Sequence, residues 1–172
     1  MTGSNDAAGP CIPGVGEGRR GVDGRIGYLF RQACAAHRIR MEHVLAPAGI
    51  TLPQFTVLTM LDAYPGVYGA DLARLTLLTP QTVCVIVGNL ERDGLLARTE
   101  HPGHGRIRRL DLTGEGRARL SHCRAEVQAL EAAMMAGLDP EACALIRRWL
   151  VGMAMPEAEL MASSDARAPL LD

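Results

Sequence analysis

Residues 79–94 read TPQTVCVIVGNLERDG, and the fold can be inferred outward from this segment. Thr79 is a strong helix-capping residue, and Pro80 suits the first position of a helix because a proline there sacrifices no hydrogen bond. Gly94 marks the end of the same helix. Four apolar side chains recur at helical spacing and should face a core: Val83, Ile86, Val87 and Leu90. The stretch therefore predicts an amphipathic helix over residues 80–93.

The residues on either side supply a second helix and a hairpin. Residues 69–75 predict a short helix with Leu72 and Ala73 inward, and a three-residue turn joins it to the first. Residues 95–100 and 107–112 predict two strands, connected by the glycine-rich basic tip HPGHGR. A helix pair followed by such a hairpin predicts a winged helix-turn-helix, mainly α with a small β-hairpin wing.

Longer helices flank this unit on both sides. Apolar spacing predicts helices over residues 25–46 and 51–64, the second with a threonine cap, and over residues 116–135 and 141–155. The last helix carries apolar side chains on more than one side, so it needs a second surface to bury against. We expect a twofold dimer formed through the terminal helices; burial inside a monomer is the alternative.

Composition sets limits on the function. The 172 residues suit one compact domain, and 48% hydrophobic with 22% charged residues excludes a disordered chain. All 18 basic residues are arginine and 19 residues are acidic, so any binding to nucleic acid must come from local clustering of charge. Aromatic residues make up only 3%, which disfavours a protein that stacks single-stranded bases. No segment approaches the ~20 apolar residues of a membrane helix, so we expect a cytoplasmic protein.

The first 23 residues are rich in glycine and proline and predict a flexible arm. Their GVGEG, at residues 14–18, has neither the preceding strand nor the following lysine of a phosphate-binding loop. We expect this domain organisation: an arm over 1–23, a domain over 24–162 in which 24–46 and 114–160 dimerise and 51–113 form the winged helix, and a tail over 163–172.

A winged helix suits duplex DNA because a helix fits the major groove and an arginine at a hairpin tip can enter the minor groove. On the helix at 80–93, Gln81 can pair with adenine and Thr82 with a base edge or a phosphate. Val85 can touch a thymine methyl group, and Asn89 a phosphate. The expected DNA contacts are Thr79, Gln81, Thr82, Val85, Asn89, Arg98, His104, Arg106 and Arg108.

The hairpin region supplies the positive charge that the whole chain lacks. Residues 92–109 contain five arginines against two acidic residues. Arginines at phosphates would provide affinity independent of sequence through counterion release, while the helix would discriminate between bases.

Five short segments occur together in a known order: LAPAGIT at 45–51, DLA at 71–73, TPQTV at 79–83, LERDGLLAR at 90–98 and LTGEG at 112–116. In this order and spacing they resemble the MarR family of transcription regulators over roughly residues 25–155. The resemblance implies a triangular, mostly helical homodimer, in which the first and the last two helices dimerise. It also implies that each subunit offers one winged helix to half of a palindromic site.

The sequence departs from the usual pattern of that family in the wing and in the recognition helix. The commonest wing has an aspartate two residues before its tip arginine, whereas this chain has His104 before Arg106. The role of Arg106 carries over, but the bracing role of the aspartate does not. Val85 replaces a polar or basic side chain and Gly88 weakens the helix, which favours an unusual operator sequence.

The resemblance further implies release from DNA by a small phenolic or anionic effector, or by oxidation of cysteine. The sequence assigns no effector site: Tyr28, Arg31, His37 and Arg38 are candidates for a cleft, although packing at a surface or interface is the simpler interpretation. The five cysteines form no Cys-x-x-Cys pair and read as reduced thiols. The redox candidates are Cys34 and Cys84.

Two sets of residues are spaced so that they could contribute to a metal site: His101 with His104, and His37 with Glu42 and His43. A histidine on the wing is more simply a phosphate contact, so we expect no metal and no cofactor. No catalytic motif is present, so we expect a binding protein and not an enzyme.

The expected partners are duplex DNA, a second copy of the chain and a small-molecule effector, with no membrane. The leading hypothesis is a dimeric DNA-binding regulator that acts as a repressor and is released from DNA by a small-molecule effector. The alternatives are a redox- or metal-responsive regulator of the same fold and a winged-helix module that binds protein. A steep salt dependence of duplex binding would distinguish a DNA-binding protein from such a module.

Overall fold

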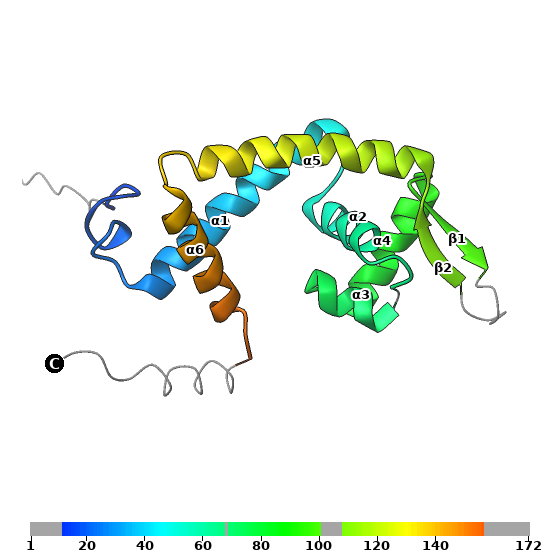
Figure 1. Ribbon diagram of the computed structural model, residues 1–172, viewed down its shortest axis with the longest axis horizontal. Helices are drawn as coiled ribbons and strands as arrows, with labels where there is room; N and C mark the ends of the chain where they lie inside the picture. The colour runs from blue at the N-terminus through cyan, green and yellow to red at the C-terminus, as the bar shows by residue number, and fades with distance from the viewer. Residues whose placement is uncertain (1–11, 68, 101–107, 157–172) are drawn as a thin grey trace, which may run out of the picture. The chain divides into compact units, whose positions relative to one another are not determined.

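The computed structural model describes residues 12–67, 69–100 and 108–156, without the side chains of Glu100 and Arg108 (Figure 1). The helices are α1 (Ile26–Leu45), α2 (Leu52–Ala63), α3 (Gly69–Thr76), α4 (Pro80–Arg92), α5 (Gly114–Met134) and α6 (Pro140–Met153). Short 3-10 turns span Gly18–Arg20 and Ala46–Ala48, and the strands are β1 (Leu96–Glu100) and β2 (Arg108–Leu112). The described residues divide into two compact units, with the boundary inside α5 between Gln128 and Ala129.

Capping residues define the starts of α2 and α4 as predicted. Thr51 and Gln54 form a reciprocal capping box, in which each side chain accepts a hydrogen bond from the other residue's backbone N–H. Thr79 accepts a hydrogen bond of 3.1 Å from the Thr82 backbone, and Pro80 occupies the first helical position. Gly94 follows α4 in the left-handed region at φ 71°, which glycine adopts without strain.

The core of the first unit lies where α2, α3, α4 and the hairpin meet (Figure 1). The predicted inward positions of α3 and α4 are confirmed as buried: Leu72, Ala73, Val83, Ile86, Val87 and Leu90. From α2 they meet Val57, Leu58 and Leu61, which are also buried. The one buried polar residue described, Thr76, satisfies its hydroxyl by donating a 2.7 Å hydrogen bond to the Leu72 carbonyl.

The hairpin is antiparallel, with Leu96 opposite Leu112 and Arg98 opposite Leu110. Because side chains alternate along a strand, Arg98 shares a face with the three leucines of this pairing, all of which are buried. Ala97 and Thr99 share the other face with Arg109 and Asp111. The arrangement confirms the expected fold class, a mainly helical winged helix-turn-helix with a two-stranded wing.

α5 begins two residues earlier than predicted because Thr113 caps it. The Thr113 hydroxyl accepts a 2.9 Å hydrogen bond from the Gly116 backbone N–H, which adds a first turn at Gly114. The buried side of the helix follows a helical repeat toward the first unit: Gly116, Leu120, Cys123 and Val127. α5 as far as Gln128 belongs to the same compact unit as the winged helix. The assignment of residues 114–160 to dimerisation stays a prediction.

α6, in the second unit, begins at Pro140 with the predicted cap. Asp139 accepts a 2.7 Å hydrogen bond from the Ala142 backbone N–H. No residue of this helix is buried, and its largest exposed apolar residues are Leu145, Trp149, Leu150, Val151 and Met153.

The end of the expected flexible arm is more structured than the sequence predicts. Gly18–Arg20 forms a 3-10 turn, and the Arg20 guanidinium donates a 2.8 Å hydrogen bond to the Pro13 carbonyl. Arg20 also exchanges two hydrogen bonds of 3.3 Å with the Gln32 side chain of α1. Polar contacts therefore give local structure to residues 13–23, although this segment has few large apolar side chains. Residues 1–11 and 157–172 lie outside the described part.

Among the described residues, no single helix has the length and apolar character needed to cross a membrane. Two pairs of consecutive helices reach that threshold only when joined across bends of 79° and 98°.

Candidate nucleic-acid interface

The surface of α4 carries the side chains that the sequence singles out for reading bases. Gln81, Thr82 and Val85 are exposed, while Asn89, two turns after Gln81, is half-buried. Val85 is 60% exposed, which is unusual for a valine in a helix whose opposite side packs into a core. The helix therefore presents one continuous outward surface with amide, hydroxyl and methyl groups, the chemistry that distinguishes base edges in the major groove.

The first turn of α4 holds two hydroxyl groups in a fixed arrangement. The Oγ1 atoms of Thr79 and Thr82 lie 2.8 Å apart, and Thr79 also caps the helix. Each hydroxyl retains bonding capacity for an outside group, since a hydroxyl offers one donor and two acceptor sites. At the other end, the Asn89 amide oxygen accepts a 3.1 Å hydrogen bond from Arg92, which leaves the Asn89 amino group free to donate.

Arg98, expected at a phosphate, instead forms a two-pronged ion pair with α4. Its Nε lies 2.6 Å from Glu91 Oε1, and its Nη2 lies 3.0 Å from Glu91 Oε2. The hydrogen bonds to Glu91 raise the pKa of Arg98, against the opposing effect of burial. The geometry joins β1 of the wing to the recognition helix.

Arg109 is also paired, on the outer side of the hairpin. Its Nε lies 2.9 Å from Asp111 Oδ1, and the Thr99 hydroxyl donates a 2.6 Å hydrogen bond to Asp111 Oδ2. With Glu91 and Asp111 included, residues 91–111 hold five arginines against four acidic residues. The positive charge of the hairpin region is thus smaller than the sequence stretch alone suggests.

The remaining expected contacts belong to the tip of the wing. His104 and Arg106 lie outside the described residues, as does His101, and the side chain of Arg108 is not described. Sequence reasoning missed Glu91 as the partner of Arg98. The alternation of β1 was the available signal, because it puts Arg98 on the leucine side of the hairpin, where a charge needs a partner.

The redox candidates Cys34 and Cys84 are both exposed free thiols. Cys123 is buried in α5, and burial raises the pKa of its thiol, so it stays protonated at neutral pH. Cys143 is partly exposed and also free, and Cys11 lies outside the described residues.

The effector candidates of α1 differ in their surroundings. Tyr28, Arg31 and Arg38 are exposed, and Arg38 lies 3.6 Å from Glu42. His37 is half-buried, and its Nδ1 atom is buried without a hydrogen-bond partner. Within the described ranges, no three histidine, cysteine or acidic side chains come together as metal ligands would, His37, Glu42 and His43 included.

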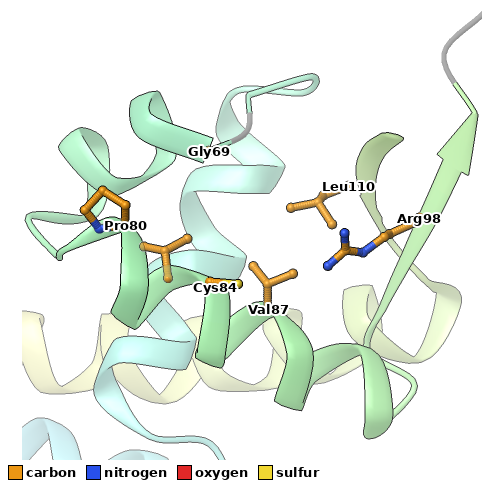
Figure 2. Close-up of a pocket in the computed structure, with 7 residues that line it drawn as sticks. Gly69, Pro80, Cys84, Val87, Arg98 and Leu110 are labelled. Carbon is orange, nitrogen blue, oxygen red and sulfur yellow. The ribbon is translucent and has the colours of Figure 1, made fainter. Parts of the chain in front are cut away.

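A cleft of about 190 Å³ lies between α4 and the hairpin (Figure 2). Its lining is mostly apolar, with one guanidinium and one thiol: Gly69, Pro80, Val83, Cys84, Val87, Arg98 and Leu110. Figure 2 shows the Arg98 side chain reaching from β1 toward Val87. A second cleft, of about 320 Å³, is lined by residues of the α1–α2 junction, among them Glu42, Ile50 and Pro53.

Comparison with known proteins agrees with this geometry. The model of the MarR family matches residues 48–107. The HTH-type transcriptional repressor Rv2887 of Mycobacterium tuberculosis is 37% identical over 116 residues, which cover 67% of this chain and 84% of that protein.

Solved structures of two proteins have the same fold. CouR bound to a 23-mer DNA duplex superposes with a TM-score of 0.70 at 28% identity, covering 76% of this chain and 93% of that one. CouR of Rhodococcus jostii RHA1 has also been solved with p-coumaroyl-CoA. Rv2887 of Mycobacterium tuberculosis in complex with salicylic acid has a TM-score of 0.62 at 34% identity, covering 77% and 98%. The family expected from the five sequence segments is confirmed, and this chain belongs to the MarR family.

Proposed function

We propose that this protein is a homodimeric transcriptional repressor that binds a palindromic operator in duplex DNA and leaves it when a small anionic effector binds. The observation that carries the proposal is the two-sided character of α4. One side is buried through Val83, Ile86, Val87 and Leu90, and the other presents Gln81, Thr82, Val85 and Asn89 beside a hairpin. The relative Rv2887 is named a repressor, and CouR has been solved on a DNA duplex.

In this proposal α4 lies in the major groove. Gln81 and Val85 read bases, the Thr79–Thr82 pair and Asn89 position the helix, and His104, Arg106 and Arg108 contact the DNA backbone or minor groove. Arg98 contributes through Glu91, by holding the wing against the helix, because its guanidinium already has a carboxylate partner. The chemistry is binding without catalysis.

The second copy of the chain is proposed to pack on apolar side chains that this chain leaves in solvent. Ile26 of α1 is 69% exposed, and Val151 of α6 is 66% exposed. Large apolar side chains exposed to this degree on a helix favour burial against a partner chain. A closed twofold contact would bury them and would place two recognition helices about one duplex turn, ~34 Å, apart.

For the effector we propose the cleft between α4 and the hairpin. Its apolar walls suit an aromatic ring and the Arg98 guanidinium suits a carboxylate, and Rv2887 has been solved with salicylic acid. A carboxylate bound there competes with Glu91 for Arg98, so binding would release the wing from α4. This exchange connects effector binding to the DNA-binding surface.

A redox-responsive regulator is the second candidate function. Cys84 lines the same cleft as Arg98, and its thiol is exposed and free. Oxidation of Cys84 would place a polar group at the same position that an effector would occupy.

The test begins with selection of duplexes from a random library by the purified full-length protein, at two salt concentrations. We expect enrichment of a palindrome and an affinity that falls steeply with salt. Salicylate, and hydrogen peroxide with and without dithiothreitol, are then added to the complex. Release by salicylate supports the anionic effector, and release by peroxide that dithiothreitol reverses supports the redox candidate. Binding without any selected sequence or salt dependence would contradict the repressor.

A further inference from the structure

The segment that leads from β2 into α5 is bonded to the end of the recognition helix. The Thr113 backbone N–H donates a 3.1 Å hydrogen bond to the Leu95 carbonyl, and the Thr113 hydroxyl donates one of 2.7 Å to the Gly94 carbonyl. The same hydroxyl accepts from the Gly116 N–H at 2.9 Å. One threonine therefore joins the exit of α4 to the first turn of α5.

Gly116 brings the two backbones closer than any other residue could. It is buried, and a Cβ atom built on it would overlap the carbonyl oxygen of Leu95. A Cβ atom built on Gly114, in the same turn, would have no such neighbour within 4 Å. Both glycines lie in the first turn of α5, but only Gly116 makes the close contact with the Leu95 backbone.

Two more contacts hold α5 to the winged-helix unit beyond this point. Arg119 donates a 2.7 Å hydrogen bond to the Ala48 carbonyl before α2, and Arg124 lies 2.7 Å from the Asp62 carboxylate near the end of α2. Between these contacts the buried side chains Leu120 and Cys123 pack into the same unit. The first four turns of α5 are therefore part of the DNA-binding body.

We propose that Thr113 and Gly116 are positioning residues for operator recognition: by fastening the recognition helix and wing to α5, they set the separation and phase of the half-sites that the dimer accepts. The inference rests on the proposed dimeric repressor and adds which residues determine its spacing specificity. Neither residue needs to contact DNA for this role.

The physical reason lies in the geometry of the duplex. Inserting one base pair between half-sites moves one of them by ~3.4 Å and turns it by ~34°. A dimer whose winged helices are rigidly attached to α5 binds both half-sites only at one separation, and it gains the high effective concentration of the second site there. A loosened attachment would accept neighbouring separations and lose part of that gain, while each winged helix would still bind a single half-site.

The experiment compares duplexes that carry the selected palindrome with its own spacer, with one or two added base pairs, and with a single half-site. The variants are Thr113→Val, which removes the hydroxyl at equal size, Thr113→Ser, which keeps it, and Gly116→Ala. Gly114→Ala is the matched control, because it adds the same methyl group in the same turn without a close neighbour. Thermal unfolding by circular dichroism accompanies each binding curve.

For the wild-type protein we expect a preference of about tenfold or more for its own spacer over the spacer longer by one base pair. Thr113→Val and Gly116→Ala should reduce this preference to about threefold or less, with half-site affinity within about twofold of wild type. Thr113→Ser and Gly114→Ala should keep the wild-type preference.

The outcomes distinguish a failure of this inference from a failure of the proposed function on which it rests. A wild-type protein that prefers no spacing contradicts the dimeric repressor itself. A wild-type preference that persists in Thr113→Val overturns the positioning role, and so does a loss of half-site affinity as large as the loss on the full palindrome. If Gly116→Ala does not fold, Thr113→Val and its serine counterpart decide the question.

Discussion

Glu91 in the last turns of α4 and Arg98 in β1 face each other through two parallel hydrogen bonds of 2.6 and 3.0 Å. The pair joins the element proposed to read bases to the element proposed to contact the minor groove. Its side chains are 43% exposed for Arg98 and 25% for Glu91, so solvent weakens the attraction without abolishing it.

Replacing Glu91 with Gln should leave the fold intact and weaken operator binding by up to about fivefold, the range of a partly exposed ion pair. The amide offers only one acceptor oxygen, so the fork is lost and the wing is held less firmly. Fluorescence anisotropy on the selected duplex measures the change. Arg38→Gln removes the exposed Arg38–Glu42 pair on α1 and serves as control. Equal affinities for Glu91→Gln and wild type would show that the pair does not support DNA binding.

Leu77 in the turn between α3 and α4 should be replaceable with a gain in stability. It has φ 55°, in the left-handed region, and it is 93% exposed, so its side chain offsets none of the strain. Leu77→Gly should raise the free energy of unfolding by about 0.5–1 kcal/mol, because glycine adopts this conformation without the steric cost that a leucine meets. Urea denaturation measures the change. Leu75→Gly, within α3, is the matched control and should lower stability; a loss for Leu77→Gly would contradict the strain.

Cys84 and Cys123 should differ in their rates of labelling by a maleimide at pH 7. Exposed Cys84 should be labelled rapidly, whereas Cys123 should be protected until the protein unfolds, because it is buried and its raised pKa disfavours the thiolate. The pKa shift also makes stability depend on pH. Since the folded pKa lies above the unfolded value of 9.0, the contribution of Cys123 is complete below pH 9 and is lost as pH rises through the folded pKa. Mass spectrometry of labelled peptides locates the label, and rapid labelling of Cys123 in the native protein would contradict its burial.

Two substitutions test the proposed division between base reading and phosphate contact. Gln81→Ala should relax specificity at one position of the operator, with a loss of about 1–3 kcal/mol on the preferred base. Arg106→Ala should weaken binding to all duplexes by a similar factor and reduce the salt dependence. Competition against operators with single base changes measures both. If the two effects are exchanged, the assignment of residues to grooves is wrong.

The recognition helix is the part of the fold that the sequence predicts best. Thr79, Pro80 and Gly94 act locally, so its start and its end can be read without knowledge of the rest of the chain. The four inward apolar residues follow from the helical repeat, and all of them are buried. The outward residues of the candidate site follow from the same repeat.

Contacts between elements distant in sequence were harder to predict. The early start of α5 depends on Thr113, whose hydroxyl is oriented by the Gly94 carbonyl 19 residues away. The pairing of Arg98 depends on how the hairpin folds onto α4, although the alternation of β1 contained part of that information. The order near Arg20 depends on Gln32, and isolated polar contacts of this kind leave no periodic pattern.

The Thr99–Asp111–Arg109 network on the outer side of the hairpin has a thermodynamic consequence for binding. Two strands alone make a marginal structure in water, and cross-strand polar contacts reduce the number of conformations available to the free protein. The stem of the wing thus reaches the duplex with its conformational entropy already reduced by folding. Binding to DNA should then require little further ordering of β1 and β2. The unfavourable entropy of ordering the wing should therefore cancel less of the favourable enthalpy of the contacts that the wing makes.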